Sequence, residues 1–127
     1  MQMWGKLYPT SYVYKYPKAG EVNSVVGVKV YDLVSKKTVT LDTGKEPDQY
    51  LPRMKWTQNA NTVAVQRLNR LQNKLELLHC NATTGAGTVV LTETDKAYVE
   101  VTNDLTYLKD GKSFVWSSER DGYKHLY

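Results

Sequence analysis

The chain repeats its own pattern at an interval of 51 residues. Residues 54–76 align without a gap on residues 105–127, so that Trp56 falls on Tyr107. The other matches are Asn59 with Asp110, Thr62 with Ser113, Val63-Ala64-Val65 with Phe114-Val115-Trp116, and Leu75 with Leu126. An interval of about 50 residues is the length of one four-stranded blade of a β-propeller. The repeat therefore predicts a radial array of antiparallel blades.

The length of the chain predicts only part of such an array. Its 127 residues hold about two and a half blades, whereas propellers close with about four to eight. The final strand pattern starts at Tyr123 and is still running at Tyr127, and domain boundaries rarely fall inside a strand. The expected fold class is all-β, a partial propeller of about two and a half four-stranded antiparallel blades, cut within the last blade.

The first 42 residues predict a connector followed by half a blade. Residues 1–23 are rich in Tyr, contain Pro9 and Pro17 and show no clear period, so we expect an extended connector or edge segment. Residues 24–42 alternate apolar and other residues around Val26 to Val30, and a polar turn leads to a second strand at 38–42. This stretch is interpreted as the outer half of a first blade.

The remaining sequence predicts one complete blade and the start of another. Residues 50–93 contain strand patterns at 53–57, 62–68, 74–80 and 88–92, and residues 104–127 contain them at 104–108, 113–118 and 123–127. Helix competes only at 68–78, where four leucines lie at helical spacing. The aligned part of the later unit contains Asp121-Gly122, a strong hairpin signal, so we expect a hairpin there.

Charge and cysteine content exclude several classes of function. The net charge is +4, but the 17 basic residues are scattered, and the densest groups are Lys36-Lys37 and Arg67 with Arg70. A nucleic-acid interface would concentrate them on one face or run, so no nucleic-acid partner is expected. The single cysteine, Cys80, excludes an internal disulfide and a cysteine cluster for zinc, and we expect it to pack on a strand.

The sequence shows no pattern typical of a membrane helix or a secretory signal. No stretch approaches the roughly 18 apolar residues of a membrane helix, and residues 1–6 lack the layout of a secretory signal. If the whole protein is exported, its signal is expected upstream. Asn81-Ala82-Thr83 is a formal glycosylation acceptor that matters only in a eukaryotic secretory context.

One neighbourhood holds the residue types of a catalytic triad. Its candidates are Ser117 or Ser118, Asp121 and His125, with Glu119 and Arg120 between them. A triad also needs an oxyanion hole, a single hairpin offers no evident donor pair for one, and no Gly-x-Ser-x-Gly elbow occurs. We expect turn capping and surface pairing from these residues.

Three other patterns favour structural roles. His79 and Cys80 are neighbours on a strand, so their side chains point to opposite faces and cannot readily share a metal ion. Gly85-Ala86-Gly87 precedes a strand and not a helix, which indicates a turn and not a phosphate cradle. Tyr12, Tyr14 and Tyr16 alternate; packing of an edge strand on a neighbour is favoured over a stacking platform for sugars or bases.

Three long segments stand out in order along the chain: Tyr16-Pro17-Lys18-Ala19-Gly20-Glu21-Val22-Asn23, residues 66–73 from Gln66 to Asn73, and residues 110–127 from Asp110 to Tyr127. Together they resemble the dipeptidyl-peptidase IV family of prolyl-oligopeptidase-like serine peptidases. The resemblance runs from about Tyr8 to the last residue and is greatest to bacterial members. It implies a slice of the N-terminal eight-bladed propeller that, in the family, covers an α/β-hydrolase domain.

The resemblance also says where the chemistry lies. The complete enzymes remove dipeptides with Pro or Ala second from peptide N-termini, and their Ser, Asp and His follow the propeller. Their paired glutamates, which hold the substrate's ammonium, precede the Tyr-Pro-Lys-Ala-Gly segment, and this chain has no Glu-Glu pair. No catalytic, substrate-binding, cofactor-binding or metal residue is therefore assigned, and no role is given to Lys96–Asn103, where the family can line the substrate cavity.

The function expected from the sequence is that of a non-catalytic propeller fragment which scaffolds and gates a substrate cavity. Expected partners are the parent's α/β-hydrolase domain and its peptide substrate, with self-association possible through open sheet edges. No cofactor is expected, and by resemblance the parent is exported to the periplasm, the exterior or a membrane anchor. The alternative is a stand-alone β-rich module that binds a protein or glycan.

Overall fold

All regular structure in the described part of the chain is β. The computed structural model describes residues 2–3, 8, 10–16 and 18–127. The strands are β1 (Gln2–Met3), β2 (Thr10–Ser11), β3 (Lys29–Tyr31), β4 (Thr38–Thr40), β5 (Gln49–Trp56), β6 (Thr62–Asn69), β7 (Lys74–Asn81), β8 (Gly87–Thr94), β9 (Thr106–Tyr107), β10 (Phe114–Val115), β11 (Ser117–Ser118) and β12 (His125–Leu126). Every pair is antiparallel. The all-β prediction is confirmed.

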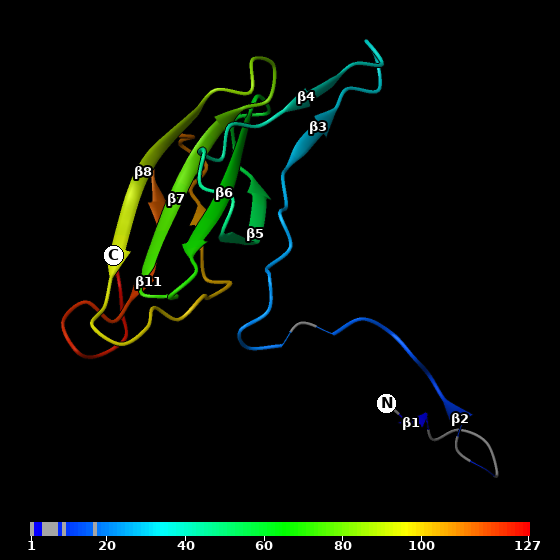
Figure 1. Ribbon diagram of the computed structural model, residues 1–127. Helices are drawn as coiled ribbons and strands as arrows, with labels where there is room; N and C mark the ends of the chain where they lie inside the picture. Colours follow the sequence, from blue (N-terminus) through cyan, green and yellow to red (C-terminus); the bar gives the residue numbers. More distant parts are fainter. Residues whose placement is uncertain (1, 4–7, 9, 17) are drawn as a thin grey trace.

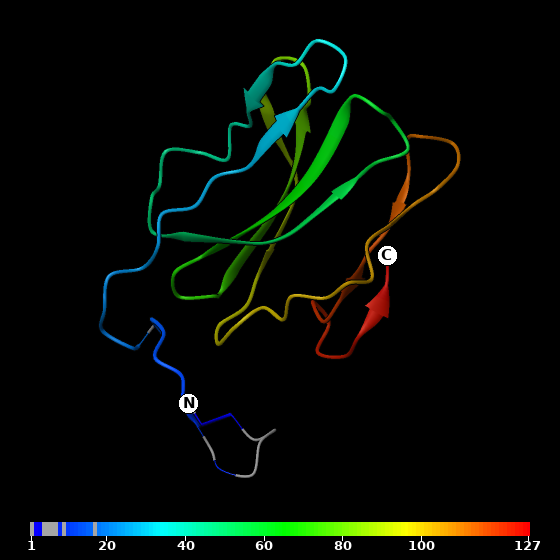
Figure 2. The ribbon, with the colours of Figure 1, turned by 90° about the vertical axis from the view of Figure 1, so that its right-hand side faces the viewer.

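A four-stranded sheet forms the centre of the molecule. Its order is β5-β6-β7-β8, a simple meander in which each strand pairs with the next in sequence. The β3–β4 hairpin lies on one side of this sheet and the β9–β12 strands on the other (Figures 1 and 2). The described residues 2–3, 8 and 10–16 lie away from the sheets in both views.

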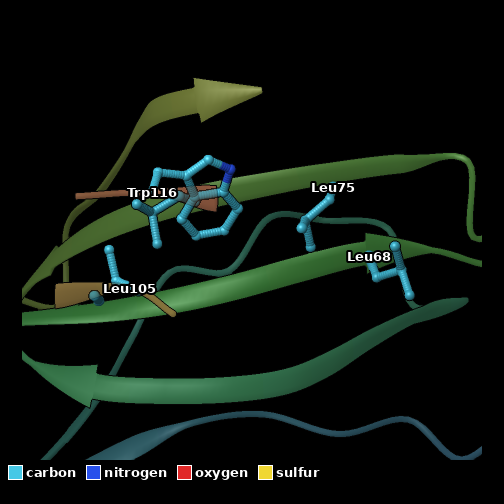
Figure 3. Packing of buried hydrophobic residues seen from close by; sticks show 6 residues of the cluster. Leu68, Leu75, Leu105 and Trp116 are labelled. Carbon is cyan, nitrogen blue, oxygen red and sulfur yellow. The ribbon is translucent and has the colours of Figure 1, made fainter. Parts of the chain in front are cut away.

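β6 and β7 are covered on both faces of the central sheet, and both strands carry apolar residues at successive positions. On the upstream face, Val63, Val65, Leu78 and Cys80 pack with Leu41 and with the half-buried Val28 and Val30 of the β3–β4 region. On the downstream face, Ala64, Leu68, Leu75 and Leu77 pack with Leu105 and Trp116 from the β9–β11 region. Figure 3 shows Trp116 and Leu105 directed at the sheet that carries Leu68 and Leu75. A strand that is covered on both faces needs apolar residues at successive positions, and this explains the dense apolar runs in β6 and β7.

The sequence repeat is a repeat of hydrogen bonds. In the central sheet Trp56 lies opposite Val63, and Thr57 N donates to Thr62 O at 3.2 Å. The equivalent residues 51 positions later do the same: Tyr107 lies opposite Phe114, and Leu108 N donates to Ser113 O at 2.9 Å. Asn59 and Asp110 cap the two turns, each side chain accepting from the backbone N–H two residues on.

The outer hairpins also share one turn, at an interval of 49 residues. Asp32 Oδ1 accepts from Val34 N and Asn81 Oδ1 accepts from Thr83 N, both at 2.8 Å. Four residues after the cap, Lys36 and Gly85 adopt positive φ angles of 55° and 81°. The β3–β4 hairpin is thus the counterpart of β7–β8.

The last hairpin departs from the repeat by two residues. The repeat places Leu126 opposite Glu119, because Leu75 lies opposite Leu68, but the structure pairs Leu126 with Ser117. The turn around Asp121-Gly122 is wider than its counterpart; Gly122 N donates to Glu119 O at 2.8 Å and Gly122 has a φ of 91°. A shift of two residues keeps every side chain on its own face.

The hairpin predicted at 68–78 is confirmed, with β6 and β7 paired from Leu68↔Leu75 to Thr62↔Asn81. The strands expected at 62–68, 74–80 and 88–92 extend one or two residues further, and those expected from Ser24 and at 104–127 are shorter. β5 begins four residues before the predicted Arg53. Pro52 lies there, where the register with β6 shifts between Tyr50 and Arg53. Proline is tolerated in an edge strand at such an irregularity.

The first 23 residues contain one short pairing that the sequence did not predict. Gln2 lies opposite Ser11 and Met3 opposite Thr10. Pro9 and Pro17, on which the connector interpretation partly rested, lie outside the described residues. The division into residues 1–23, 24–42, 50–93 and 104–127 stays a prediction.

Arg67 binds the segment between β4 and β5, which joins the first hairpin to the central sheet. Its guanidinium donates to Glu76 at 2.7 and 3.0 Å and to Thr43 O at 2.7 Å. Burial disfavours ionisation of Glu76, but the bonds from Lys74 and Arg67 outweigh this and lower its pKa. Gly44 has a φ of 96°, and a Cβ there would collide with the Arg67 side chain, so this position requires glycine.

Two leucines test the importance of the downstream core. Leu75 is fully buried, whereas Leu71, four residues earlier in the β6–β7 turn, is 75% exposed. Leu75→Ala is expected to lower the free energy of unfolding by about 2–5 kcal/mol through lost burial and a cavity. Leu71→Ala should change it by less than about 0.5 kcal/mol. Urea unfolding followed by far-UV circular dichroism measures both, and equal effects would contradict this packing.

Candidate functional site

The β11 strand places two buried serines beside a carboxylate and two cations. Ser117 Oγ donates to Asp104 Oδ2 at 2.7 Å and lies 3.1 Å from Thr102 Oγ1. Lys124 Nζ lies 3.2 Å from the same Asp104 oxygen. The hydrogen bond from Ser117, and next the one from Lys124, lower the pKa of Asp104. A carboxylate held in its ionised form is a poor base, so this arrangement restrains Ser117 without activating it.

Ser118 belongs to a different network. Its Oγ accepts from Arg120 N at 3.2 Å and from Arg120 Nε at 3.0 Å. Arg120 also donates to Glu93 at 3.0 Å and its guanidinium carbon lies 4.1 Å from the centre of the Tyr127 ring. This side chain therefore joins the end of β8 to the last hairpin.

The residues singled out as triad candidates are not assembled into one. His125 lies opposite Ser118 in the β11–β12 register but is exposed and makes no hydrogen bond with either serine within residues 102–127, all of which are described. A hydrogen bond to Asp121, and next burial, raise the pKa of the Tyr127 hydroxyl, so the partner of Asp121 is Tyr127 and not a serine or His125. The actual hydrogen-bond partners of Ser117 are Asp104 and Thr102, and Lys124 pairs with Asp104; these residues carry no spacing signal that sequence reasoning could have used.

A cleft of about 260 Å³ lies between the end of β8 and the last hairpin. Its lining residues are Thr92–Asp95, Tyr98–Glu100, Thr102, Ser117–Arg120 and Lys124. Half of the Lys96–Asn103 stretch therefore borders it. The stretch is held by backbone bonds to the β6–β7 turn: Val99 N donates to Gln72 O at 2.8 Å and Asp95 N to Asn73 O at 3.0 Å.

A smaller cleft of about 100 Å³ lies between the inner strands. It is lined by Arg53, Met54, Lys55, Ala64, Gln66, Thr102, Asn103 and Leu105. Arg53 donates to Asn103 Oδ1 at 2.7 Å and Lys55 to Leu105 O at 2.8 Å. Both cations are thus used to join β5 to the segment that enters β9.

His79 and Cys80 point to opposite faces, as expected from a strand. On the downstream face, His79 Nε2 lies 2.7 Å from the Tyr107 hydroxyl, and both rings contact Phe114. Burial lowers the pKa of His79 and raises that of Tyr107 to about 12. On the upstream face burial raises the pKa of the Cys80 thiol, which leaves it inert.

The glycine and tyrosine patterns have structural explanations. Gly85 lies in the β7–β8 turn and Gly87 is the first residue of β8; a Cβ at these positions would meet the backbone oxygens of Thr40 and Asp42. Close packing of the first hairpin therefore requires both glycines. Tyr12, Tyr14 and Tyr16 follow β2 and contact one another, with centroids 5.8 and 6.4 Å apart. Whether they pack on a neighbour or serve as a platform stays a prediction.

The remaining candidates are surface features. Lys36-Lys37 lies in the β3–β4 turn, Arg67 is paired with Glu76, and Arg70 lies 3.9 Å from Asp48. Asn81 uses its Oδ1 as the cap of the β7–β8 turn. Among the residues that the structure covers, no group of three potential metal ligands occurs, and no helix is long and apolar enough to cross a membrane.

The chain matches a known protein family along its whole length. The family model described as "Dipeptidyl peptidase IV (DPP IV) N-terminal region" covers residues 1–127. A curated relative, "Inactive dipeptidyl peptidase 10" of Rattus norvegicus, is 38% identical over 125 residues, which is 94% of this chain but 14% of the rat protein. The chain therefore spans about a seventh of the length of this relative.

Two solved structures contain the same fold. The crystal structure of Porphyromonas gingivalis dipeptidyl peptidase 4 superimposes on all of this chain with a TM-score of 0.87 and 37% identity, over 18% of its own length. That of a Bacteroides ovatus protein described as a dipeptidyl aminopeptidase IV gives 0.82 and 31% over 95% of this chain and 17% of its own length. The partial-propeller prediction is confirmed by these neighbours.

The contact between His79 and Tyr107 predicts a dependence of stability on pH. Because burial lowers the pKa of His79 below its ordinary 6.5, the folded state favours the neutral ring. The stability that the neutral His79 ring contributes to the folded state is fully present above pH 6.5 and is lost as the pH falls through the lowered pKa. Between about pH 7.5 and 5, His79→Gln should therefore lose less unfolding free energy than the unmodified chain.

Urea unfolding at both pH values measures this difference. The only other histidine, His125, is exposed, so His125→Gln is the matched control and should retain the original pH dependence. The assignment of this pH dependence to His79 would be contradicted if the unfolding free energy of His79→Gln changed with pH as much as that of the unmodified chain. A reduced pH dependence in His125→Gln would contradict it as well.

Proposed function

The chain belongs to the family of dipeptidyl peptidase IV N-terminal regions, and from that premise we propose that it is a non-catalytic propeller segment of a dipeptidyl peptidase. In the whole protein it scaffolds the substrate cavity and restricts entry to short, unstructured peptide ends. The observation that carries this proposal is the match along all 127 residues to proteins of which the chain spans only 14–18%.

The side chains support a scaffold. Several polar groups of the types found in active sites join neighbouring segments of the chain: Ser117 donates to Asp104, Arg120 donates to Glu93, and His79 contacts the Tyr107 hydroxyl. Groups held in this way set the angle and spacing of consecutive blades. They provide no activated nucleophile with a base and an oxyanion hole.

The whole protein would remove Xaa-Pro or Xaa-Ala dipeptides from peptide N-termini. Support comes from the name of the Porphyromonas gingivalis structure. The chemistry would belong to an α/β-hydrolase domain in another part of the protein. The rat relative is named inactive although 38% of the aligned residues are identical, so likeness in this segment alone does not decide whether a protein is active.

The position of the clefts supports a gating role. Both clefts lie between neighbouring sheets and are lined by segments that enter or leave the inner strands. Inner strands of a propeller surround its central channel. Residues 96–103 would then contribute to the wall that peptides pass.

Export of the parent and weak self-association of the isolated chain belong to the same proposal. Extracellular or periplasmic peptides are the substrates that such an enzyme would meet. Self-association would use β8, the outermost strand of the central sheet, which is eight residues long and exposes Val89 and Val90. A strand of this length with one unpaired edge is a template for pairing with another chain.

The activity assay compares the purified chain with the whole protein on a chromogenic Gly-Pro substrate. The whole protein should release the dipeptide, whereas the 127-residue chain should give no release above buffer. Release by the chain alone would overturn its non-catalytic role. An inactive whole protein would overturn the activity proposed for the parent and leave the role of the segment to be judged by its structure.

A further inference from the structure

Two polar positions of the repeat are paired in the later unit but not in the earlier one. At the interval of 51 residues, Arg53 corresponds to Asp104 and Gln66 to Ser117. In the later unit Ser117 Oγ donates to Asp104 Oδ2 at 2.7 Å. In the earlier unit a cation and an amide hold the same two positions, opposite each other in the β5–β6 register. The earlier pair therefore has a guanidinium where the later pair has a carboxylate.

Gln66 is a buried polar side chain in the lining of the smaller cleft. It is 3% exposed, and its Oε1 has no hydrogen-bond partner in the described part of the chain. Arg53, directly opposite, bonds elsewhere: its Nε donates to Asn103 Oδ1 at 2.7 Å and its Nη1 to Pro52 O at 2.8 Å. Because a buried acceptor without a donor is costly, this position favours a ligand that carries a hydrogen-bond donor.

The same cleft carries uncompensated positive charge. Arg53 and Lys55 lie two positions apart on β5, so both side chains are on one face of the strand. Lys55 Nζ donates to Leu105 O at 2.8 Å, and its ammonium has further donors. Among the described residues that line the cleft, none carries a carboxyl group. Asp104, which follows the lining residues in sequence, is paired with Lys124. The cleft therefore favours an anion.

The size of the cleft selects a compact ligand. Ala64, which lies opposite Lys55, leaves a volume of about 100 Å³, well below the roughly 300–1,000 Å³ of pockets that bury drug-sized molecules. A hydrogen phosphate ion meets all three demands, because it is small, its charged oxygens accept hydrogen bonds and its hydroxyl donates one. Sulfate has the same shape and charge but no hydrogen to offer Gln66 Oε1.

We propose that Arg53, Lys55 and Gln66 bind one inorganic hydrogen phosphate ion in the smaller cleft. The two cations donate to its charged oxygens, and its hydroxyl donates to Gln66 Oε1. The bound ion joins β5 and β6 to residues 102–105, which form the opposite wall of the cleft. A phosphomonoester has lost its acidic hydrogen at neutral pH, so the site favours the free ion. The site does not depend on whether the whole protein hydrolyses peptides.

Titration of the full chain with sodium phosphate, sodium sulfate and methyl phosphate tests the site. At about pH 7.5 and constant ionic strength, NMR should show saturable shifts of the Arg53 Nε–H, the Gln66 side-chain amide and the backbone amides of residues 102–105. Phosphate should bind at least about tenfold more tightly than sulfate, because only phosphate satisfies the buried acceptor. Methyl phosphate, which is mainly without its hydrogen at this pH, should bind more weakly than the free ion.

Variants separate the proposed site from general attraction to a basic chain. Gln66→Met keeps the volume of the side chain but removes the acceptor, so the affinity for phosphate should fall to that for sulfate, while the affinity for sulfate changes by less than about twofold. Arg53→Gln should weaken the binding of both ions at least about tenfold. Lys112→Gln removes one positive charge from the exposed β9–β10 turn and should change neither affinity.

Four results would overturn the proposal. They are the absence of saturable shifts at the cleft, equal affinities for phosphate and sulfate in the unmodified chain, a Gln66→Met chain that still prefers phosphate, and tighter binding of methyl phosphate than of the free ion. The last result would assign the cleft to a phosphomonoester. Far-UV circular dichroism of each variant shows whether the substitution has left the fold intact, and Lys112→Gln controls for the loss of charge.

Discussion

The structure depends on burying the central sheet on both faces. Its strands β6 and β7 alternate between two apolar sets, and neither set can be covered by the sheet itself. Sheets pack face to face about 10 Å apart, so each face needs a neighbouring sheet. The β3–β4 hairpin supplies one cover and the β9–β11 region the other, with Trp116 as the largest buried side chain. The stacking of blades is thus a consequence of the β6 and β7 sequences.

The polar groups follow from the same constraint. Where two sheets meet, buried donors and acceptors must find partners in the next sheet. Arg67 reaches the Thr43 carbonyl, Lys55 reaches the Leu105 carbonyl, and His79 meets the Tyr107 hydroxyl. These contacts explain why residues typical of active sites occur in a segment whose proposed role is architectural.

The periodicity of the sequence made the fold predictable. The side-chain contacts of the candidate site were less predictable. The interval between Trp56 and Tyr107 and the alternation in β6 and β7 predicted four antiparallel strands and a hairpin in place of a helix. The inner strand was predicted to begin at Arg53, whereas β5 begins at Gln49, ahead of the register shift between Tyr50 and Arg53. The β11–β12 register shift was missed because a two-residue change leaves the apolar pattern intact. The partners of Ser117 could not be predicted, since Asp104 and Thr102 reach it only through the fold of the segment that connects β8 to β9.

Amide hydrogen exchange of the full chain, resolved by residue, tests the central claim most directly. If the central sheet is stabilised by a cover on each face, the slowest exchange will lie in the paired amides of β6 and β7. The β3–β4 hairpin and the β9–β12 strands, each covered on one face by the central sheet, will exchange faster. Slowest exchange in β3–β4 or β9–β12, or uniform protection across all strands, would contradict the account.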